Sequence, residues 1–178
     1  MQSSMEVDGL AELEKQLKQL DLVAQKKVLR KATRESAKPI QKKIEQNVSA
    51  MGHVDTGLLA ESIKTRVSFP KRRTWADVVA SVGVFKLNSL MRQFGLDPKK
   101  DMPPTVYGWW LEHGTQPHRT GSGAKASTGK NQDKGLMHPG ILAKPFIRPA
   151  FDSQLTSTVG IQKNVLAKEI DKALKKGR

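Results

Sequence analysis

The sequence predicts an α+β fold, with residues 1–178 forming one domain. Three patterns indicate it. Leucines recur every three or four residues near the N-terminus, two β-rich runs follow each other in the middle of the chain, and a second helical periodicity occupies the C-terminal end. The expected architecture is a long N-terminal helical region, a small and mainly antiparallel sheet, a C-terminal helix and one long flexible loop.

The N-terminal helical region is predicted from a stripe of apolar residues. Asp8 and Gly9 are candidate starting residues, and the stripe resumes between Val28 and Val48. Pro39 interrupts it and predicts a kink or a break just before that residue. We expect the stripe to pack in the core, or in part against a neighbouring subunit. Four leucines open it at helical spacing: Leu10, Leu13, Leu17 and Leu20.

Two runs with strand periodicity predict a hairpin over residues 63–69 and 75–85. Its turn carries a dense basic cluster, Lys71, Arg72 and Arg73. This cluster could face a phosphate backbone or could only keep the turn solvated.

The second half of the chain mixes short elements with irregular segments. Residues 86–106 look like an insertion that carries a short helix. Residues 116–140 are mostly small and polar, which predicts a flexible loop that is mobile or is ordered by a partner. Residues 141–152 restore the apolar density. The last helix is predicted to begin at about Ser153, and residues 153–178 comprise this helix and a basic tail.

The chain is strongly basic. It has 31 Lys and Arg residues against 17 Asp and Glu residues, for a net charge of +14. Residues 1–60 carry +2, residues 61–120 carry +5 and residues 121–178 carry +7, so the N-terminal third is nearly neutral. A basic field attracts polyanions such as nucleic acid, or it serves only solubility. No helix-turn-helix, zinc-finger or RNP signature is present.

Several function classes are disfavoured. The chain has no cysteine, which excludes a disulfide framework and a thiol nucleophile. No apolar run is long enough for a membrane span, and the polar N-terminus is unlike a secretory signal. None of the familiar catalytic or phosphate-binding motifs occurs. We therefore expect no catalysis, no cofactor and no metal. The four histidines match no metal-ligand spacing: His53, His113, His118 and His138.

Glu112 is the only acidic residue within an aromatic segment, Tyr107 to Thr115. A buried carboxyl beside tryptophans could have a raised pKa. We favour instead a pairing with an arginine or a role in capping backbone amides.

Three segments, taken together, resemble a known family. They are DTGLLAESIK at residues 55–64, YGWWLEHGT at residues 107–115 and AKPFIRPAFD at residues 143–152. They are similar to the "TG-L--SI", "Y----E-GT" and "PF-RPA" motifs of a tailed-bacteriophage family of small neck or minor tail proteins. Its members are often called tail-completion or head–tail joining proteins. The opening at residues 7–13 also fits, and the resemblance spans about residues 5–155.

The resemblance implies a structural virion protein at the head–tail junction, assembled in the cytoplasm of the host bacterium. Such a protein completes the tail and joins it to the DNA-filled head. The implied partners are other copies of the chain in a ring, the tail terminator, the tail tube and the portal or head-completion proteins. Genomic double-stranded DNA would lie nearby in the channel, and no membrane is involved. Two alternatives are a basic protein that binds nucleic acid through non-specific phosphate contacts, and a hydrolase or metalloenzyme.

Two groups of residues are candidates for these roles. The motifs supply residues for the core or for a subunit interface. Gly57 is suited to a turn with positive φ, Gly114 to a helix end, and Arg148 to a bond with Glu112. The interface or core candidates are Thr56, Gly57, Tyr107, Trp109, Trp110, Glu112, Gly114, Thr115, Pro145, Phe146, Arg148, Pro149 and Phe151. The candidates for facing DNA are Lys71, Arg72, Arg73, Lys172, Lys175, Lys176 and Arg178.

Overall fold

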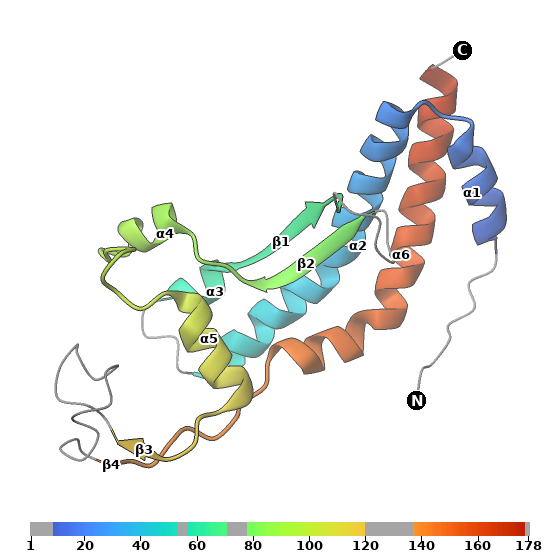
Figure 1. The fold of residues 1–178 in the computed structure, drawn as a ribbon. Helices are drawn as coiled ribbons and strands as arrows, with labels where there is room; N and C mark the ends of the chain where they lie inside the picture. Colours follow the sequence, from blue (N-terminus) through green and yellow to red (C-terminus); the bar gives the residue numbers. More distant parts are fainter. Residues whose placement is uncertain (1–8, 53–56, 71–77, 120–136, 177–178) are drawn as a thin grey trace. The chain divides into compact units, whose positions relative to one another are not determined.

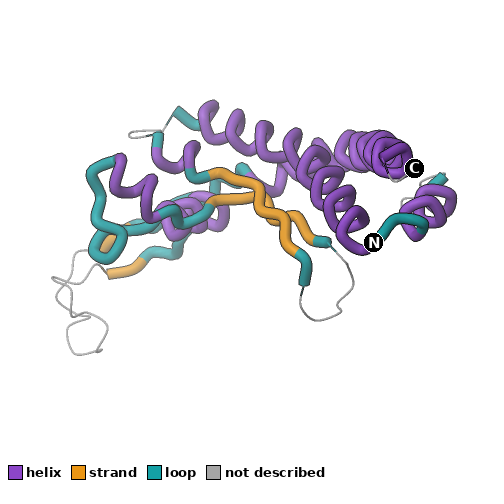
Figure 2. Tube along the Cα trace, turned by 90° about the horizontal axis from the view of Figure 1, so that it is seen from above, coloured by secondary structure: helices purple, strands orange, loops and turns teal. Residues whose placement is uncertain are grey.

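The computed structural model describes residues 9–52, 57–70, 78–119 and 137–176. The chain divides into two compact units, each assembled from separate stretches of sequence. The first unit comprises residues 1–46, 63–83 and 150–178, and the second comprises residues 47–62 and 84–149. Figures 1 and 2 show the trace of both units. The expectation that residues 1–178 act as one domain stays a prediction.

Helices dominate the first unit: α1 (Leu10–Lys18), most of α2 (Leu22–Ala50) and most of α6 (Ile147–Lys176). Leu13, Val28 and Ile170 form a buried cluster that joins the three helices, and Leu17 and Leu20 pack against it. Leu13, Leu17 and Leu20 of the predicted leucine stripe therefore pack in the core, whereas Leu10 is 47% exposed. The side chain of Asp21 caps α2 by accepting the backbone N–H groups of residues 23 and 24, each at 2.8 Å.

Pro39 lies inside α2, and the helix continues through it. Of the two predicted outcomes, a break before this residue is wrong, whereas a kink stays a prediction. A proline in a helix interior costs about 3 kcal/mol because it removes one backbone hydrogen bond. Ala37, Ile40 and Ile44 are all buried on one face around it. Packing of this face outweighs the local penalty, as is usual for helices in proteins.

The sheet of the first unit consists of β1 (Ile63–Ser68) and β2 (Val79–Val84), which run antiparallel (Figures 1 and 2). The predicted hairpin is confirmed, with shorter strands than expected. Thr65 donates a 2.8 Å hydrogen bond from its hydroxyl to the side-chain oxygen of Gln41, which ties β1 to α2. The basic cluster predicted at the turn, Lys71 to Arg73, lies outside the described residues.

Short elements build the second unit: α3 (Leu58–Glu61), α4 (Asn88–Gln93), α5 (Pro104–His113), β3 (His118–Arg119) and β4 (Met137–His138). The predicted insertion at residues 86–106 supplies α4, whose Met91 is fully buried. β3 and β4 pair antiparallel, with His118 opposite His138. The expectation of a loop throughout residues 116–140 is therefore wrong at both ends, and residues 120–136 lie outside the described part.

The C-terminal helix begins at Ile147, several residues before the predicted start near Ser153. Pro149 lies within the helix, although proline disrupts helix interiors. Here it occupies the first turn, where the backbone N–H has no partner within the helix, so its absence costs little. The helix then continues to Lys176. No described helix is long and apolar enough to cross a membrane.

Candidate functional site

The aromatic helix α5 has well-defined ends. It begins at Pro104, where proline is favoured because the first N–H groups of a helix are unpaired. It ends at Gly114, which has a φ of 73° and donates its N–H to the carbonyl of Trp110 at 2.7 Å. A Cβ on Gly114 would lie 2.6 Å from the carbonyl oxygen of Ile141. Gly114 therefore ends the helix as predicted, and no larger residue fits there without displacing the backbone.

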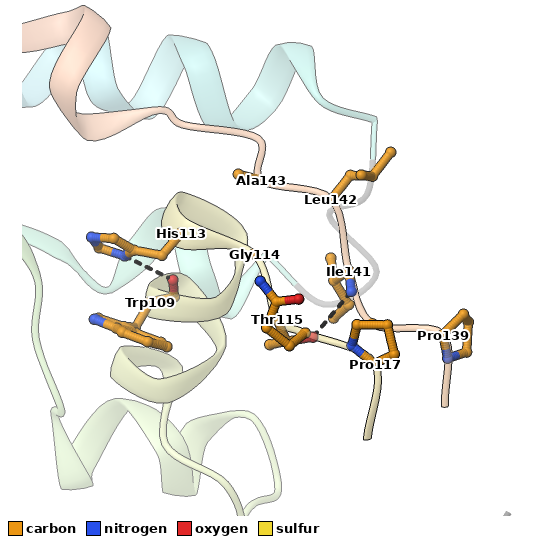
Figure 3. A pocket seen from close by; sticks show the side chains of 11 residues that line it. Trp109, His113, Gly114, Thr115, Pro117, Pro139, Ile141, Leu142 and Ala143 are labelled. Atoms are coloured by element: carbon orange, nitrogen blue, oxygen red, sulfur yellow. Dashed lines mark hydrogen bonds between the residues drawn. The ribbon is translucent and has the colours of Figure 1, made fainter. Parts of the chain in front are cut away.

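Two rings of α5 form a stacked pair at the surface. The indole of Trp109 is 57% exposed and stacks on the imidazole of His113, with ring centroids 4.8 Å apart. Nδ1 of His113 lies 3.1 Å from the carbonyl oxygen of Trp109, which fixes the imidazole against the helix end (Figure 3). The pair presents a broad aromatic surface to solvent.

Glu112 joins α5 to the start of α6. Its Oε2 accepts the backbone N–H groups of Phe146 and Ile147 at 2.7 and 2.9 Å, and its Oε1 accepts that of Arg148 at 3.0 Å. The first N–H groups of a helix carry partial positive charge, so a carboxylate suits this position. Glu112 contacts Arg148 only through its backbone N–H, so the predicted pairing with the guanidinium group is wrong. Of the roles considered for Glu112, capping of backbone amides is the one observed.

The segment after α5 pairs with the segment before α6. Thr115 and Ile141 form an isolated antiparallel bridge, with N–H to carbonyl distances of 2.9 and 3.1 Å. The hydroxyl of Thr115 also accepts the N–H of Ile141 at 3.0 Å. Gly140 has a φ of 88°, and a Cβ there would overlap the carbonyl oxygen of Thr115. Glycines at 114 and 140 thus allow the two backbones to approach closely.

An open groove of about 870 Å³ lies between α5 and these paired segments (Figure 3). Leu142, on its rim, is 87% exposed, and Trp109 forms its aromatic wall. None of the described residues that line it is Lys, Arg, Asp or Glu, although the chain carries a net charge of +14. The groove is lined by Trp109, His113, Gly114, Thr115, Gln116, Pro117, Pro139, Gly140, Ile141, Leu142 and Ala143.

The sequence that contains α5 matches a known protein family. Residues 11–114 match the family described as "Bacteriophage HK97-gp10, putative tail-component". The chain belongs to this family. The match covers more than half of the sequence and includes all of α5, on which the groove is built. No curated protein and no solved structure gives a significant match.

Membership of the HK97-gp10-like family makes the protein a structural component of a phage tail and places it in the virion. The resemblance found in the sequence is thereby confirmed at the level of the family. The matched range contains the segment at residues 55–64 and ends one residue before Thr115. The third motif, at residues 143–152, lies beyond it. This motif nevertheless meets the second one in space through Glu112.

The motif residues divide into buried and exposed positions. Phe146 is fully buried, Trp110 is half-buried, and the other aromatic candidates are at the surface. Trp109 and Phe151, each about half exposed, are therefore not core residues. Gly57 has the positive φ that was predicted, 72°, whereas Thr56 lies outside the described residues. The remaining exposed candidates are Tyr107, Pro145, Arg148 and Pro149.

The residues predicted to face DNA are only partly described. Lys172 and Lys175 are exposed on the last turns of α6. The side chain of Lys176 and the whole of Arg178 lie outside the described part of the chain. Contact of these residues with DNA stays a prediction.

The histidines of the second unit make local contacts. His118 and His138 stack across the β3–β4 pair with ring centroids 5.1 Å apart. Nδ1 of His138 accepts the N–H of Gly140 at 3.0 Å. His53 lies outside the described residues. Within the described ranges, no group of three or more His, Cys, Asp or Glu side chains could hold a metal ion.

Sequence reasoning missed two surface features, one on each unit. Pro139, Ile141 and Leu142 line the groove, but their segment carried no signal beyond its apolar content. The second omission is a row of exposed basic residues on α2. Counting charge for that helix alone would have found it.

Proposed function

We propose that this tail component acts at the head–tail junction, where copies of it form a ring that completes the tail and joins it to the DNA-filled head, without catalysis. The observation that carries the proposal is the uncharged, partly apolar groove on the second unit, at the end of a helix within the family match. Exposed aromatic and aliphatic side chains that gather in one hollow are typical of surfaces that a partner covers.

We infer from the charge distribution that a second copy of the chain binds in this groove. Each copy carries +14, so two copies repel over most of their surfaces. A groove whose described lining residues include no Lys, Arg, Asp or Glu is a place where two copies can meet without bringing cations together. A groove on one copy that receives a different surface of the next gives a head-to-tail interface, and such interfaces form rings when the rotation between copies closes. The tail tube, tail terminator and portal or head-completion proteins would then contact other faces of the ring, and DNA would pass through its channel.

The test combines a substitution in the groove with a matched one elsewhere. Leu142→Asp places a charge in the groove at a position that is 87% exposed, so the fold should be retained. Leu22→Asp makes the same change at a position on the first unit that is 71% exposed. Light scattering after size exclusion should show an oligomer for the wild-type protein and for Leu22→Asp, and a monomer for Leu142→Asp.

Complementation of a phage that lacks this gene gives the biological readout. The Leu142→Asp variant should yield filled heads and separate tails, whereas Leu22→Asp should yield joined particles. Assembly of Leu142→Asp like the wild type would exclude the groove as the subunit interface. Joined particles in the complete absence of the protein would exclude the junction role itself.

A further inference from the structure

A row of cations runs along the solvent-exposed face of α2. Five exposed residues form this row, and we call them the basic stripe: Lys27, Lys31, Arg34, Lys38 and Lys42. Their spacing of three or four residues places them on one helix face, and they extend over about 22 Å at 1.5 Å per residue. The opposite face carries the buried residues Ala32, Ile40 and Ile44. The stripe is therefore a continuous surface feature and not a set of scattered lysines.

The net charge counted over residues 1–60 does not reveal that α2 is strongly basic. Residues 1–60 have a net charge of only +2, but residues 22–50, the extent of α2, hold eight basic and two acidic residues. The helix alone is therefore at +6. The acidic residues that balance it lie mostly ahead of α2 in the sequence.

Acidic partners neutralise only part of the stripe. Lys31 pairs with Glu169 at 2.7 Å, and Lys38 pairs with Glu35 at 2.6 Å. The Lys31 ammonium lowers the pKa of the Glu169 carboxyl by donating a hydrogen bond to it. Among the described residues, the other three stripe cations have no acidic side chain in contact.

The basic surface continues onto α6. Lys27, Lys31 and Lys172 line a shallow hollow of about 180 Å³ between the two helices, with Glu169 beside them. Lys168, Lys172 and Lys175 are exposed on α6 at helical spacing. Two neighbouring helices of the first unit thus share one cationic face, which no single segment of the sequence reveals.

The composition of this face indicates the class of its partner. Lysine is depleted at protein–protein interfaces, where aromatic residues and methionine are enriched. Lysine and arginine are the side chains that contact phosphates along a nucleic-acid backbone. A duplex presents one negative charge per about 1.7 Å of its axis, a continuous line of charge that a row of cations can follow.

We propose that the basic stripe of α2 binds the phosphate backbone of double-stranded DNA without sequence selectivity. This inference deepens the proposed function, because it assigns to the first unit the surface that meets the DNA crossing the head–tail junction. It differs from the sequence-based expectation, which placed DNA contacts on the hairpin turn and the C-terminal tail.

The experiment measures binding of the full-length protein to a fluorescent duplex of random sequence over a range of salt concentrations. A triple variant, Lys27→Gln, Arg34→Gln and Lys42→Gln, removes the three stripe cations that contact no acidic side chain within the described part of the chain. The control, Arg92→Gln, Lys99→Gln and Lys100→Gln, removes the same charge from exposed positions on the second unit. Glutamine has nearly the helix propensity of lysine and arginine, so both variants should fold, which circular dichroism checks.

Five phosphate contacts predict a slope of about −4.5 for log Kobs against log salt, and two remaining contacts predict about −2. Between about 50 and 200 mM salt, the wild-type and control proteins should lose about 500-fold in affinity, and the stripe variant only about tenfold. The stripe variant should also bind at least tenfold more weakly than the control at the lower salt concentration.

Equal binding by the stripe and control variants would overturn the proposal, as would a wild-type slope near zero. Poly-L-glutamate that displaced the duplex at equal charge concentration would overturn it in favour of an acidic protein partner. The oligomeric state of the stripe variant separates the two proposals. Because the groove is on the second unit, a stripe variant that loses DNA binding should still form the oligomer that Leu142→Asp abolishes.

Discussion

Replacing Glu112 by alanine would remove one acceptor group that serves three backbone N–H groups at the start of α6. The N–H groups of Phe146 and Ile147 are partly buried, whereas that of Arg148 is exposed and can bond to water instead. A hydrogen bond to a charged group contributes about 1.5–3 kcal/mol. Counting the two partly buried bonds at the low end of that range, we expect the free energy of unfolding to fall by about 3 kcal/mol.

Urea unfolding followed by tryptophan fluorescence measures this loss, because Trp109 and Trp110 lie on the same helix as Glu112. In a thermal scan, about 3 kcal/mol corresponds to a Tm lower by about 6–12 °C for a chain of this size. Glu112→Gln keeps one oxygen acceptor but loses the charge, so it should be destabilised by about half as much.

Glu61→Ala is the matched control, since it removes an exposed carboxylate from the same unit. Its effect should stay within about 0.5 kcal/mol. An effect of Glu112→Ala as small as that of Glu61→Ala would refute the view that this carboxylate holds the start of α6. If Glu112→Gln were as damaging as Glu112→Ala, the charge of the carboxylate and its second acceptor oxygen would account for the whole effect.

Two further predictions concern a helix end and an ion pair. Gly114→Ala should destabilise the protein by at least about 2 kcal/mol, because it combines a positive φ with a Cβ 2.6 Å from the Ile141 carbonyl. Gly95→Ala, at a φ of 74° with open space around it, should cost only about 1 kcal/mol in the same urea assay, and equal losses would argue against the close approach. The Lys31 ammonium holds the pKa of Glu169 below its ordinary value of 4.5, so this pair stabilises the fold above that pH and the contribution is lost as the pH falls through the lowered pKa. Lys31→Gln should therefore reduce the loss of stability on acidification, and a stability–pH curve identical to that of the wild type would contradict the assignment.

Local patterns in the sequence predicted most of the elements. The leucine stripe, the hairpin, α5 and the helix end at Gly114 all depend on interactions between residues close in sequence, and all are observed. The continuity of α2 through Pro39 was not predictable in this way, because buried side chains on both sides of the proline decide it. The early start of α6 likewise depends on Glu112, which lies more than thirty residues before that helix in the chain.

The candidate surfaces show a similar division. The sequence singled out Trp109, but its exposure and its stacking on His113 required the fold. Leu142 joins the groove only because Thr115 pairs with Ile141, a contact that no periodicity encodes. The basic stripe was present in the sequence, but counting charge over sixty residues averaged it with the acidic residues that precede α2.

The bridge between Thr115 and Ile141 also bears on how the length of the chain between these two residues can vary. The hydrogen bonds of this bridge and of the β3–β4 pair hold the two ends of the intervening segment together. The entropic cost of closing a loop rises only by about 0.6 kcal/mol for each doubling of its length. Insertions between Arg119 and Met137 should therefore be tolerated while the groove stays intact. The same position would accept a peptide tag for locating the protein within the virion.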